Sequence, residues 1–180
     1  MSKNICDYSQ PSFYKFSEDS INLSKEVLSL MEYSFSVTYP LKGLDLFSGC
    51  GVVGLEIMRN IDRDISFDFV ELQKDYKFFF NKNVQKFLKD DNMEKARFLN
   101  MNYLDLRNDG DIKYDLIVSN PPYLSEDDKA LKKLQYEPKK ALISGADGLD
   151  DIRILARECS NLLTQNGWLL VEHGACQEES

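Results

Sequence analysis

Short apolar runs alternate with amphipathic segments along most of this chain. Each run has the length of a buried strand, and the segments between the runs have the length or periodicity of helices. Because parallel strands need a long crossover that usually holds a helix, this alternation predicts an α/β fold with a doubly wound, mostly parallel sheet flanked by helices. The predicted strands are Leu41–Phe47, Ile65–Val70, Ala96–Met101, Tyr114–Ser119 and Trp168–Glu172.

Helical segments are predicted between these strands and before the first one. Ser20 is expected to cap the first helix, and Asn166-Gly167 is expected to turn the chain into the last strand. The predicted helices are Ile21–Tyr33, the stretch that ends near Asn60, Lys74–Lys89, a charged helix-like segment at Glu126–Gln135, and a helix from Asp150 or Asp151 to Leu163.

An aromatic-rich arm precedes the first helix. Tyr8, Phe13, Tyr14 and Phe16 are interleaved with polar residues, and we expect the arm to pack on the sheet or over a ligand. The chain is divided into this arm and helix, residues 1–40, and a main domain, residues 41–180, which together make one globular unit.

Composition and charge exclude several classes of protein. The 180 residues carry a formal charge of −8 and have a pI near 4.7, which gives no overall attraction for nucleic acid. No apolar run is long enough to span a bilayer and the N-terminus lacks a signal-peptide core, so a cytoplasmic protein without a membrane partner is expected. The four cysteines are scattered and His173 is the only histidine, so neither a disulfide framework nor a metal site is expected.

Three glycines lie at the turn that follows the first strand. Gly49, Gly51 and Gly54 form a G-x-G-x-x-G pattern, whose first two glycines allow close approach of a ligand and whose third allows helix–strand packing. Glu71 ends the second strand about 20 residues later, where a carboxylate can accept hydrogen bonds from two ribose hydroxyls. Asn102-Tyr103 follows the third strand and could flank an adenine ring.

The fourth strand stops at Asn120-Pro121-Pro122-Tyr123, which we call the hook. Both prolines fix φ, so the hook is a rigid turn at the carboxyl end of a strand, where ligands bind in open α/β sheets. A planar NH2 group could give one hydrogen to the Asn120 side-chain oxygen and the other to the Pro121 carbonyl, while the Tyr123 ring stacks on its face. Taken alone, the same residues could be a proline-rich turn that only ends a strand.

These motifs resemble those of the class I S-adenosylmethionine-dependent amino-methyltransferases. The matching residues are Asp45-Leu-Phe-Ser-Gly-Cys-Gly51, Glu71 and Val118-Ser-Asn-Pro-Pro-Tyr123. A further segment resembles the release-factor glutamine methyltransferases, which methylate a glutamine side-chain amide in peptide-chain release factors. It comprises Tyr136-Glu-Pro, Gly145-Ala-Asp-Gly-Leu-Asp150, Glu172-His-Gly174 and Gln177, and the whole resemblance covers about Gly43 to Gln177.

The resemblance implies a Rossmann-like fold, S-adenosyl-L-methionine as cofactor and a release factor as protein substrate. It implies that the loop Phe47, Ser48, Gly49, Cys50 and Gly51 surrounds the methionyl part of the cofactor, and that Asp45 supports this loop or binds the amine. Glu71 would bind the ribose, and Asn102 and Tyr103 would flank the adenine. Asn120, Pro121, Pro122 and Tyr123 would hold the substrate amide against the methyl group, for direct in-line transfer without a metal or covalent nucleophile, and Asn120 would also contact the cofactor.

Three features depart from the family's pattern. Only a short arm stands where the family has an N-terminal helical domain, and the segment Tyr14–Ser20 looks more like that of adenine-modifying tRNA enzymes. The antiparallel strand pair that ends the family's sheet has no sequence after Glu172. We therefore expect either a sequence that is cut short or a reduced form of the enzyme, with the fifth strand left as an edge.

Three alternatives stay open. The hook is shared with enzymes that methylate the exocyclic amine of adenine, so Tyr123 could stack a flipped base in tRNA, rRNA or DNA. A nicotinamide-dependent oxidoreductase would use the same glycines and Glu71, but has no need for the hook. A binding module without catalysis would keep the fold and the cofactor.

Overall fold

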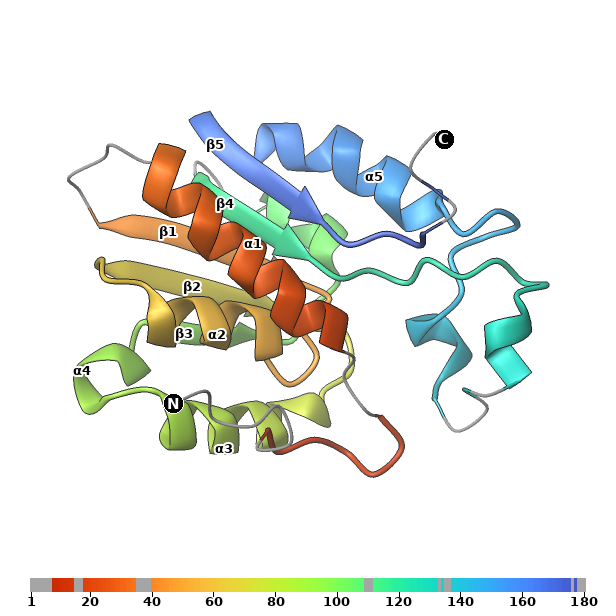
Figure 1. Cartoon of the computed structure of the whole chain (residues 1–180), viewed down its shortest axis with the longest axis horizontal. Coiled ribbons are helices and arrows are strands. Elements are labelled where there is room, and N and C mark those ends of the chain that lie inside the picture. The colour runs from red at the N-terminus through yellow and green to blue at the C-terminus, as the bar shows by residue number, and fades with distance from the viewer. Residues whose placement is uncertain are drawn as a thin grey trace.

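Five parallel strands form one sheet in the order β3-β2-β1-β4-β5 (Figure 1). The computed structural model describes residues 8–14, 18–34, 40–108, 112–132, 134, 137–175 and 177. The strands are β1 (Leu41–Leu46), β2 (Ile65–Val70), β3 (Ala96–Leu99), β4 (Tyr114–Ser119) and β5 (Leu163–Val171). The predicted α/β fold with a parallel sheet is confirmed.

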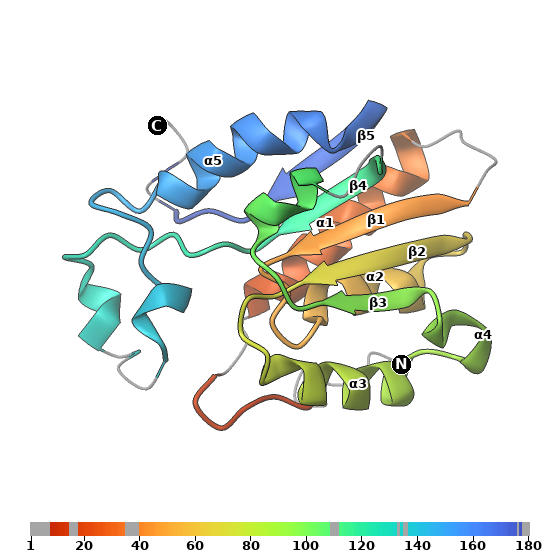
Figure 2. The ribbon, with the colours of Figure 1, turned by 180° about the vertical axis from the view of Figure 1, so that it is seen from behind.

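Helices cover both faces of the sheet. α1 (Glu18–Ser34), α2 (Val52–Asn60) and α3 (Tyr76–Phe87) lie on the face nearer the viewer in Figure 1. The opposite face carries α5 (Asp150–Glu158) and the short 3-10 helix η2 (Tyr103–Asn108), as Figure 2 shows. The remaining short elements are α4 (Asp90–Met93), η3 (Lys129–Lys132), η4 (Lys139–Ala141) and η5 (Cys159–Asn161). Within the described residues, no helix is both long and apolar enough to cross a membrane.

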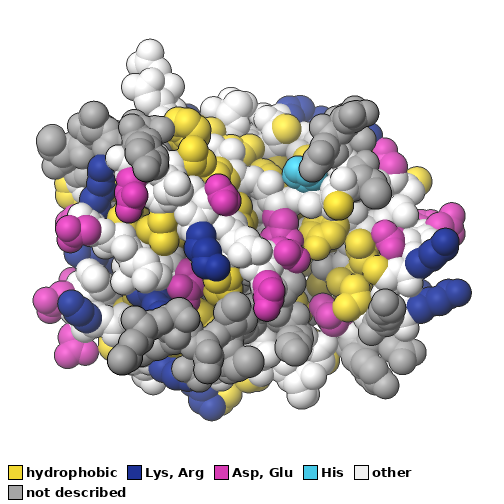
Figure 3. Space-filling model, in the orientation of Figure 1, with side chains coloured by type: hydrophobic (Ala, Val, Ile, Leu, Met, Phe, Trp, Pro, Cys, Tyr) yellow, Lys and Arg dark blue, Asp and Glu magenta, His cyan; other side chains and the backbone are white. Residues whose placement is uncertain are grey.

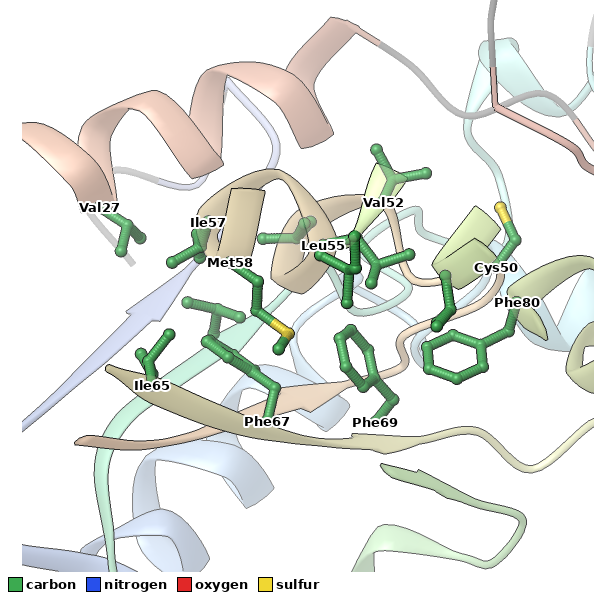
Figure 4. Close-up of a cluster of buried hydrophobic side chains, with 14 of the residues drawn as sticks. Val27, Cys50, Val52, Leu55, Ile57, Met58, Ile65, Phe67, Phe69 and Phe80 are labelled. Carbon is green, nitrogen blue, oxygen red and sulfur yellow. The ribbon is translucent and has the colours of Figure 1, made fainter. Parts of the chain in front are cut away.

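Each face of the sheet carries its own apolar core, because alternate residues of a strand point to opposite faces. Toward α2, the rings of Phe67 and Phe69 on β2 pack against side chains such as Leu55 and Met58 (Figure 4). Toward α5, Ile117 on β4 belongs to a second cluster with Leu155. All six residues of β4 are buried, which explains why Leu116, Ile117 and Val118 form an unbroken apolar run within it.

The N-terminal arm packs on the helices α2 and α3. Tyr8 is buried, and its hydroxyl donates to Glu56 Oε1 at 2.7 Å. Asn83 on α3 accepts from the Ser9 backbone N–H at 2.7 Å and donates to the Ser9 carbonyl at 2.9 Å. The arm thus contacts helices, whereas its aromatic pattern predicts packing on the sheet or over a ligand. Phe16, Cys6, Cys176 and Tyr136 lie outside the described residues.

Three predicted local features are wrong. Ser20 does not cap α1, because α1 begins at Glu18 and Ser20 lies in its first turn. Among the described residues of the segment 126–135, the only helical element is the short η3, which buries none of its residues and therefore lacks an apolar face to hold a longer helix. The last predicted helix ends at Glu158 and continues as η5.

Strand β5 begins five residues earlier than predicted. Leu163 pairs with Tyr114 and Trp168 pairs with Leu116, so the extra residues between them form an irregular bulge. Asn166-Gly167 lies inside this bulge and is not a separate turn before the strand. A Cβ atom on Gly167 would lie 2.8 Å from the Tyr114 carbonyl oxygen, which explains glycine at this close approach.

Candidate active site

The loops after β1 and β4 meet where the strand order reverses. From β1 the sheet continues through β2 and β3 on one side and through β4 and β5 on the other. Such a switch point opens a crevice at the carboxyl ends of the strands. A pocket at this point is lined by residues of β1, of the loop after it, of α2, of α1, of the arm and of the hook. They are Tyr14, Ser20, Asp45, Phe47, Ser48, Cys50, Val52, Val53 and Asn120.

The glycine loop is shaped by backbone requirements. Gly51 has a φ of 84°, a left-handed conformation that side chains rarely adopt, and it directly precedes α2. A Cβ atom on Gly54 would lie 2.5 Å from the Phe69 ring, so only glycine lets α2 approach β2 this closely. The helix–strand packing predicted at Gly54 agrees with this geometry, whereas close approach of a ligand at Gly51 stays a prediction. Burial raises the pKa of the Cys50 thiol to about 12, so this group stays protonated near neutral pH.

Asp45 fastens the start of α2 to the end of β1. Its Oδ2 accepts a hydrogen bond from the Gly54 backbone N–H at 2.9 Å, and the side chain is buried. Burial raises the pKa of Asp45 from 3.8 to about 7; the Gly54 N–H opposes this effect and the nearby charge of Glu71 adds to it. A buried carboxyl group that titrates near neutrality inside a pocket is suited to an approaching cation.

Glu71 holds the glycine loop from the end of β2. Its Oε2 accepts from the Gly49 N–H at 3.0 Å and its Oε1 from the Gln73 N–H at 2.8 Å. Burial raises the pKa of Glu71, while these amide donors act in the opposite direction. Each carboxylate oxygen keeps a further lone pair for a ligand hydroxyl.

Ser48 brings an unsatisfied hydroxyl to the pocket. The residue is 8% exposed, and its Oγ has no hydrogen-bond partner within the described part of the chain. Because burying a hydroxyl without a partner costs about 1–3 kcal/mol, this Oγ is a candidate for contact with a polar ligand group.

The hook begins beside the same pocket. The Asn120 Nδ2 donates to Ser20 Oγ at 3.1 Å, which turns the amide so that its oxygen remains available as an acceptor. Pro121 and Pro122 are buried. The Tyr123 carbonyl accepts from Gln177 Nε2 at 3.0 Å, so the hook is supported from the segment that follows β5.

Asn102 and Tyr103, in the segment that follows β3, have different environments. The Tyr103 ring lies 5.0 Å from the Phe47 ring, centroid to centroid, and its hydroxyl donates to Asp151 Oδ1 at 3.4 Å. Asn102 is exposed, and its Oδ1 accepts from the Leu104 N–H at 3.0 Å. The structure therefore brings Tyr103 next to the glycine loop, whereas the Asn102 side chain is engaged in its own turn.

Three residues at this site were not singled out from the sequence as site residues. Ser20 orients Asn120, and Tyr14 lines the pocket from the arm with a pKa raised well above its usual value by burial. Glu172 follows β5 and accepts a long hydrogen bond of 3.5 Å from the Tyr123 hydroxyl. The interleaved aromatics of the arm were a signal for Tyr14, and Glu172 belongs to the Glu172-His-Gly174 segment of the resemblance, although no role was assigned to it. No local pattern pointed to a place for Ser20 in the site.

The surroundings of the hook are acidic. Burial raises the pKa of Glu172 to about 7, and the nearby Asp19 adds to this effect. The charge of Glu137 acts on both Tyr14 and Tyr123 and raises their pKa values. Figure 3 shows acidic side chains in the middle of this face, over the carboxyl ends of the strands. Phosphate groups would meet repulsion at this position.

Comparison with known proteins gives relatives over part of the chain. A family model described as "Conserved hypothetical protein 95" matches residues 31–145, more than half of the chain.

A release factor glutamine methyltransferase of Coxiella burnetii is 47% identical over 66 residues, 37% of this chain and 24% of the relative. A bifunctional methyltransferase of Rickettsia felis is 34% identical over 148 residues, 77% of this chain and 26% of the relative. A ribosomal protein uL3 glutamine methyltransferase of Francisella tularensis is 35% identical over 136 residues, 74% of this chain and 41% of the relative. The chain spans about a quarter of the length of the first two relatives.

Several solved structures of similar fold carry the names of methyltransferases, at low sequence identity. One of them, a methyltransferase complexed with SAH, has a TM-score of 0.62 and 16% identity, and the match covers 90% of this chain and 37% of that one. TrmN from Thermus thermophilus has a TM-score of 0.57 and 17% identity, with 86% of this chain and 38% of that one covered. The chain therefore belongs to the Conserved hypothetical protein 95 family and has the Rossmann-like fold of class I methyltransferases.

Proposed function

We propose that this protein transfers a methyl group from S-adenosyl-L-methionine to a planar NH2 group, namely the side-chain amide of a glutamine in a protein such as a release factor. One observation carries the proposal. Residues of the glycine loop, among them Phe47 and Ser48, line the same pocket as Asn120 of the hook. A donor held by the loop and an acceptor held by the hook would therefore face each other across a short gap.

The residues around the glycine loop fit the cofactor chemically. When bound, S-adenosyl-L-methionine supplies an activated methyl group on a sulfonium. Asp45 would attract its ammonium group, and the unsatisfied Ser48 Oγ would hydrogen-bond to its polar methionyl end. Glu71 would accept from the ribose hydroxyls while it keeps its bonds to the loop. Tyr103, which packs on Phe47, would flank the adenine, with Asn102 at its edge.

The hook would hold the methyl acceptor. Because Ser20 accepts from the Asn120 Nδ2, the Asn120 oxygen can accept one hydrogen of an NH2 group. The Pro121 carbonyl would accept the second hydrogen, and the Tyr123 ring would stack on the planar group. Two acceptors fix the direction of the nitrogen, so the protein contributes mainly alignment, which lowers such barriers by up to about 7–11 kcal/mol.

Two observations favour a protein substrate. Relatives over part of the chain carry the names of glutamine methyltransferases that act on release factors or on ribosomal protein uL3. The acidic groups at the hook, among them Asp19, Glu137 and Glu172, would also repel nucleic-acid phosphates. The half-buried Tyr123 ring keeps the adenine amine of tRNA, rRNA or DNA as the competing substrate.

A methyl-transfer assay with labelled S-adenosyl-L-methionine tests the proposal. The full chain is incubated with release factor, ribosomal protein uL3, tRNA, rRNA or DNA, and the label is expected in protein at a glutamine. Labelling of nucleic acid alone would overturn the assigned substrate class. A calorimetric titration with SAH against NAD is run beside it; binding of NAD in preference to SAH would contradict the cofactor.

An Asn120→Ala variant tests the role of the hook. We expect methyl transfer to fall by a factor of about 100 or more, because an aligned acceptor is lost, while SAH affinity changes less than about threefold. Asn161→Ala is the matched control, since Asn161 is exposed and precedes β5 at the opposite end of the strand. Near-normal turnover in Asn120→Ala would remove Asn120 from the mechanism.

A further inference from the structure

Glu172 lies beside Asn120 at the carboxyl edge of the sheet. Val171, the last residue of β5, pairs with Ser119, the last residue of β4, so Glu172 and Asn120 each follow the final pair. The Glu172 backbone N–H still donates to the Ser119 carbonyl at 2.9 Å, which continues the pairing past the strand end. Neighbouring residues of paired parallel strands point to the same face, and Asn120 points to Ser20 on α1.

The two oxygens of Glu172 have different environments. Oε1 accepts from the Tyr123 hydroxyl at 3.5 Å, a long bond. Oε2 is buried and has no hydrogen-bond partner among residues that the structure describes. A buried carboxylate oxygen next to the residue that would hold the acceptor nitrogen has the chemistry of a hydrogen-bond and proton acceptor.

We infer that Glu172 is a catalytic residue that accepts a hydrogen bond from the substrate NH2 group and takes up the proton that its nitrogen loses. This inference rests on the proposed function. The nitrogen forms a bond to the methyl carbon, the carbon–sulfur bond breaks with its electron pair on sulfur, and one N–H proton passes to Glu172 Oε2. The protonated carboxyl group then returns the proton to water. Atoms and charge balance without a further reactant.

The groups that face Glu172 suit this task. Asp19 on α1 adds negative charge, His173 is its neighbour in the chain, and Tyr123 and Tyr14 bring aromatic hydroxyls from the hook and the arm. Burial and Asp19 together raise the pKa of Glu172 to about 7, and a base whose pKa lies near the working pH is effective in both taking up and releasing a proton.

The variant Glu172→Gln tests the inference, because glutamine keeps the size and the acceptor for Tyr123 but removes the basic oxygen. The wild-type kcat is expected to rise about tenfold per pH unit below pH 7 and to level above it. In the variant we expect kcat at pH 8 to fall by a factor of about 100 and this limb of the profile to vanish. The dissociation constant of SAH should stay within twofold. Asp45 titrates in the same range, but it is present in both proteins, so the comparison isolates Glu172.

Carboxyl NMR provides a readout that does not depend on turnover. In protein labelled with ¹³C at glutamate carboxyl groups, one resonance should titrate near pH 7 and be absent from Glu172→Gln. Asp19→Asn should move that midpoint to lower pH, since it removes the added negative charge. Absence of any glutamate with a midpoint above pH 6 would overturn the inference.

A second variant separates proton uptake from support of Tyr123. Tyr123→Phe removes the hydroxyl that Glu172 holds and lowers kcat, but it should keep the pH limb because Glu172 remains. Loss of the limb in Tyr123→Phe, or an unchanged profile in Glu172→Gln, would overturn the inference while leaving the proposed function intact. The exposed Glu94→Gln is the matched control with unchanged kcat. A wild-type protein that binds SAH but methylates no substrate would overturn the proposed function, and this inference with it.

Discussion

Replacing Asp45 with asparagine tests the electrostatics of the pocket through the stability of the fold. Asparagine keeps an oxygen that can accept from the Gly54 N–H, the bond that Asp45 makes at 2.9 Å. It removes the ionisable proton. The variant therefore changes one quantity, the dependence of the free energy of unfolding on pH, with little change in packing.

The magnitude follows from the pKa of Asp45, which burial raises from 3.8 to about 7. The folded protein binds the proton of the Asp45 carboxyl group more tightly than the unfolded chain does. The stability that this bound proton contributes is therefore complete below pH 3.8 and is lost as the pH rises through 7. The difference of about three pH units corresponds to about 4 kcal/mol over the full range. Between pH 5.5 and 8.5 the loss is about 2 kcal/mol.

Urea unfolding followed by circular dichroism measures this loss. The series starts at pH 5.5, above the pI of about 4.7, where the protein has net charge and stays in solution. The stability of wild type relative to Asp45→Asn should fall by about 2 kcal/mol up to pH 8.5. With an m-value of about 2 kcal/mol/M, the difference between their midpoints should change by roughly 1 M urea. A difference between the two proteins that stays constant within about 0.5 kcal/mol across this range would refute the reasoning, because the remaining titrating groups are common to both.

Two further substitutions test contacts around the pocket. Ser48→Ala removes the buried hydroxyl that has no described partner. We therefore expect the free energy of unfolding to rise by about 1 kcal/mol and the affinity for SAH, measured by calorimetry, to fall by about 3- to 10-fold. A less stable variant would mean that the Ser48 Oγ is hydrogen-bonded in solution. Asn83→Ala removes two bonds to Ser9 and one to the Cys50 carbonyl, so we expect a loss of about 2–4 kcal/mol and faster cleavage of the arm in limited proteolysis. An arm equally resistant to protease in both proteins would argue against this anchor.

The central strands were predictable because their environment is uniform. Each of β1, β2 and β4 is flanked by strands and covered by helices, so its apolar run in the sequence coincides with the strand. β5 is at the edge, and each of its residues is either partly buried or exposed, so the sequence at its start carries less signal. The bulge before Trp168 depends on pairing with Tyr114, which is about 50 residues away in the chain.

The candidate site divides in the same way. The glycine loop and the hook are local motifs, and their backbone requirements can be recognised from glycine and proline. The contact of Ser20 with Asn120 joins residues that are 100 positions apart, and it depends on how α1 crosses the sheet. In the sequence Ser20 had the properties of a helix cap, and only packing reveals its position in the pocket.

The two bonds of Glu71 to backbone amides have a consequence for any exchange of this side chain. Both oxygens already serve as acceptors, one for Gly49 and one for Gln73. A glutamine at this position would present an NH2 group to one of those N–H groups, so a donor would oppose a donor inside a crowded turn. The nominally conservative replacement would thus disturb the geometry of the glycine loop before any ligand arrives, and aspartate, one methylene shorter, would reach at most part of the same pair.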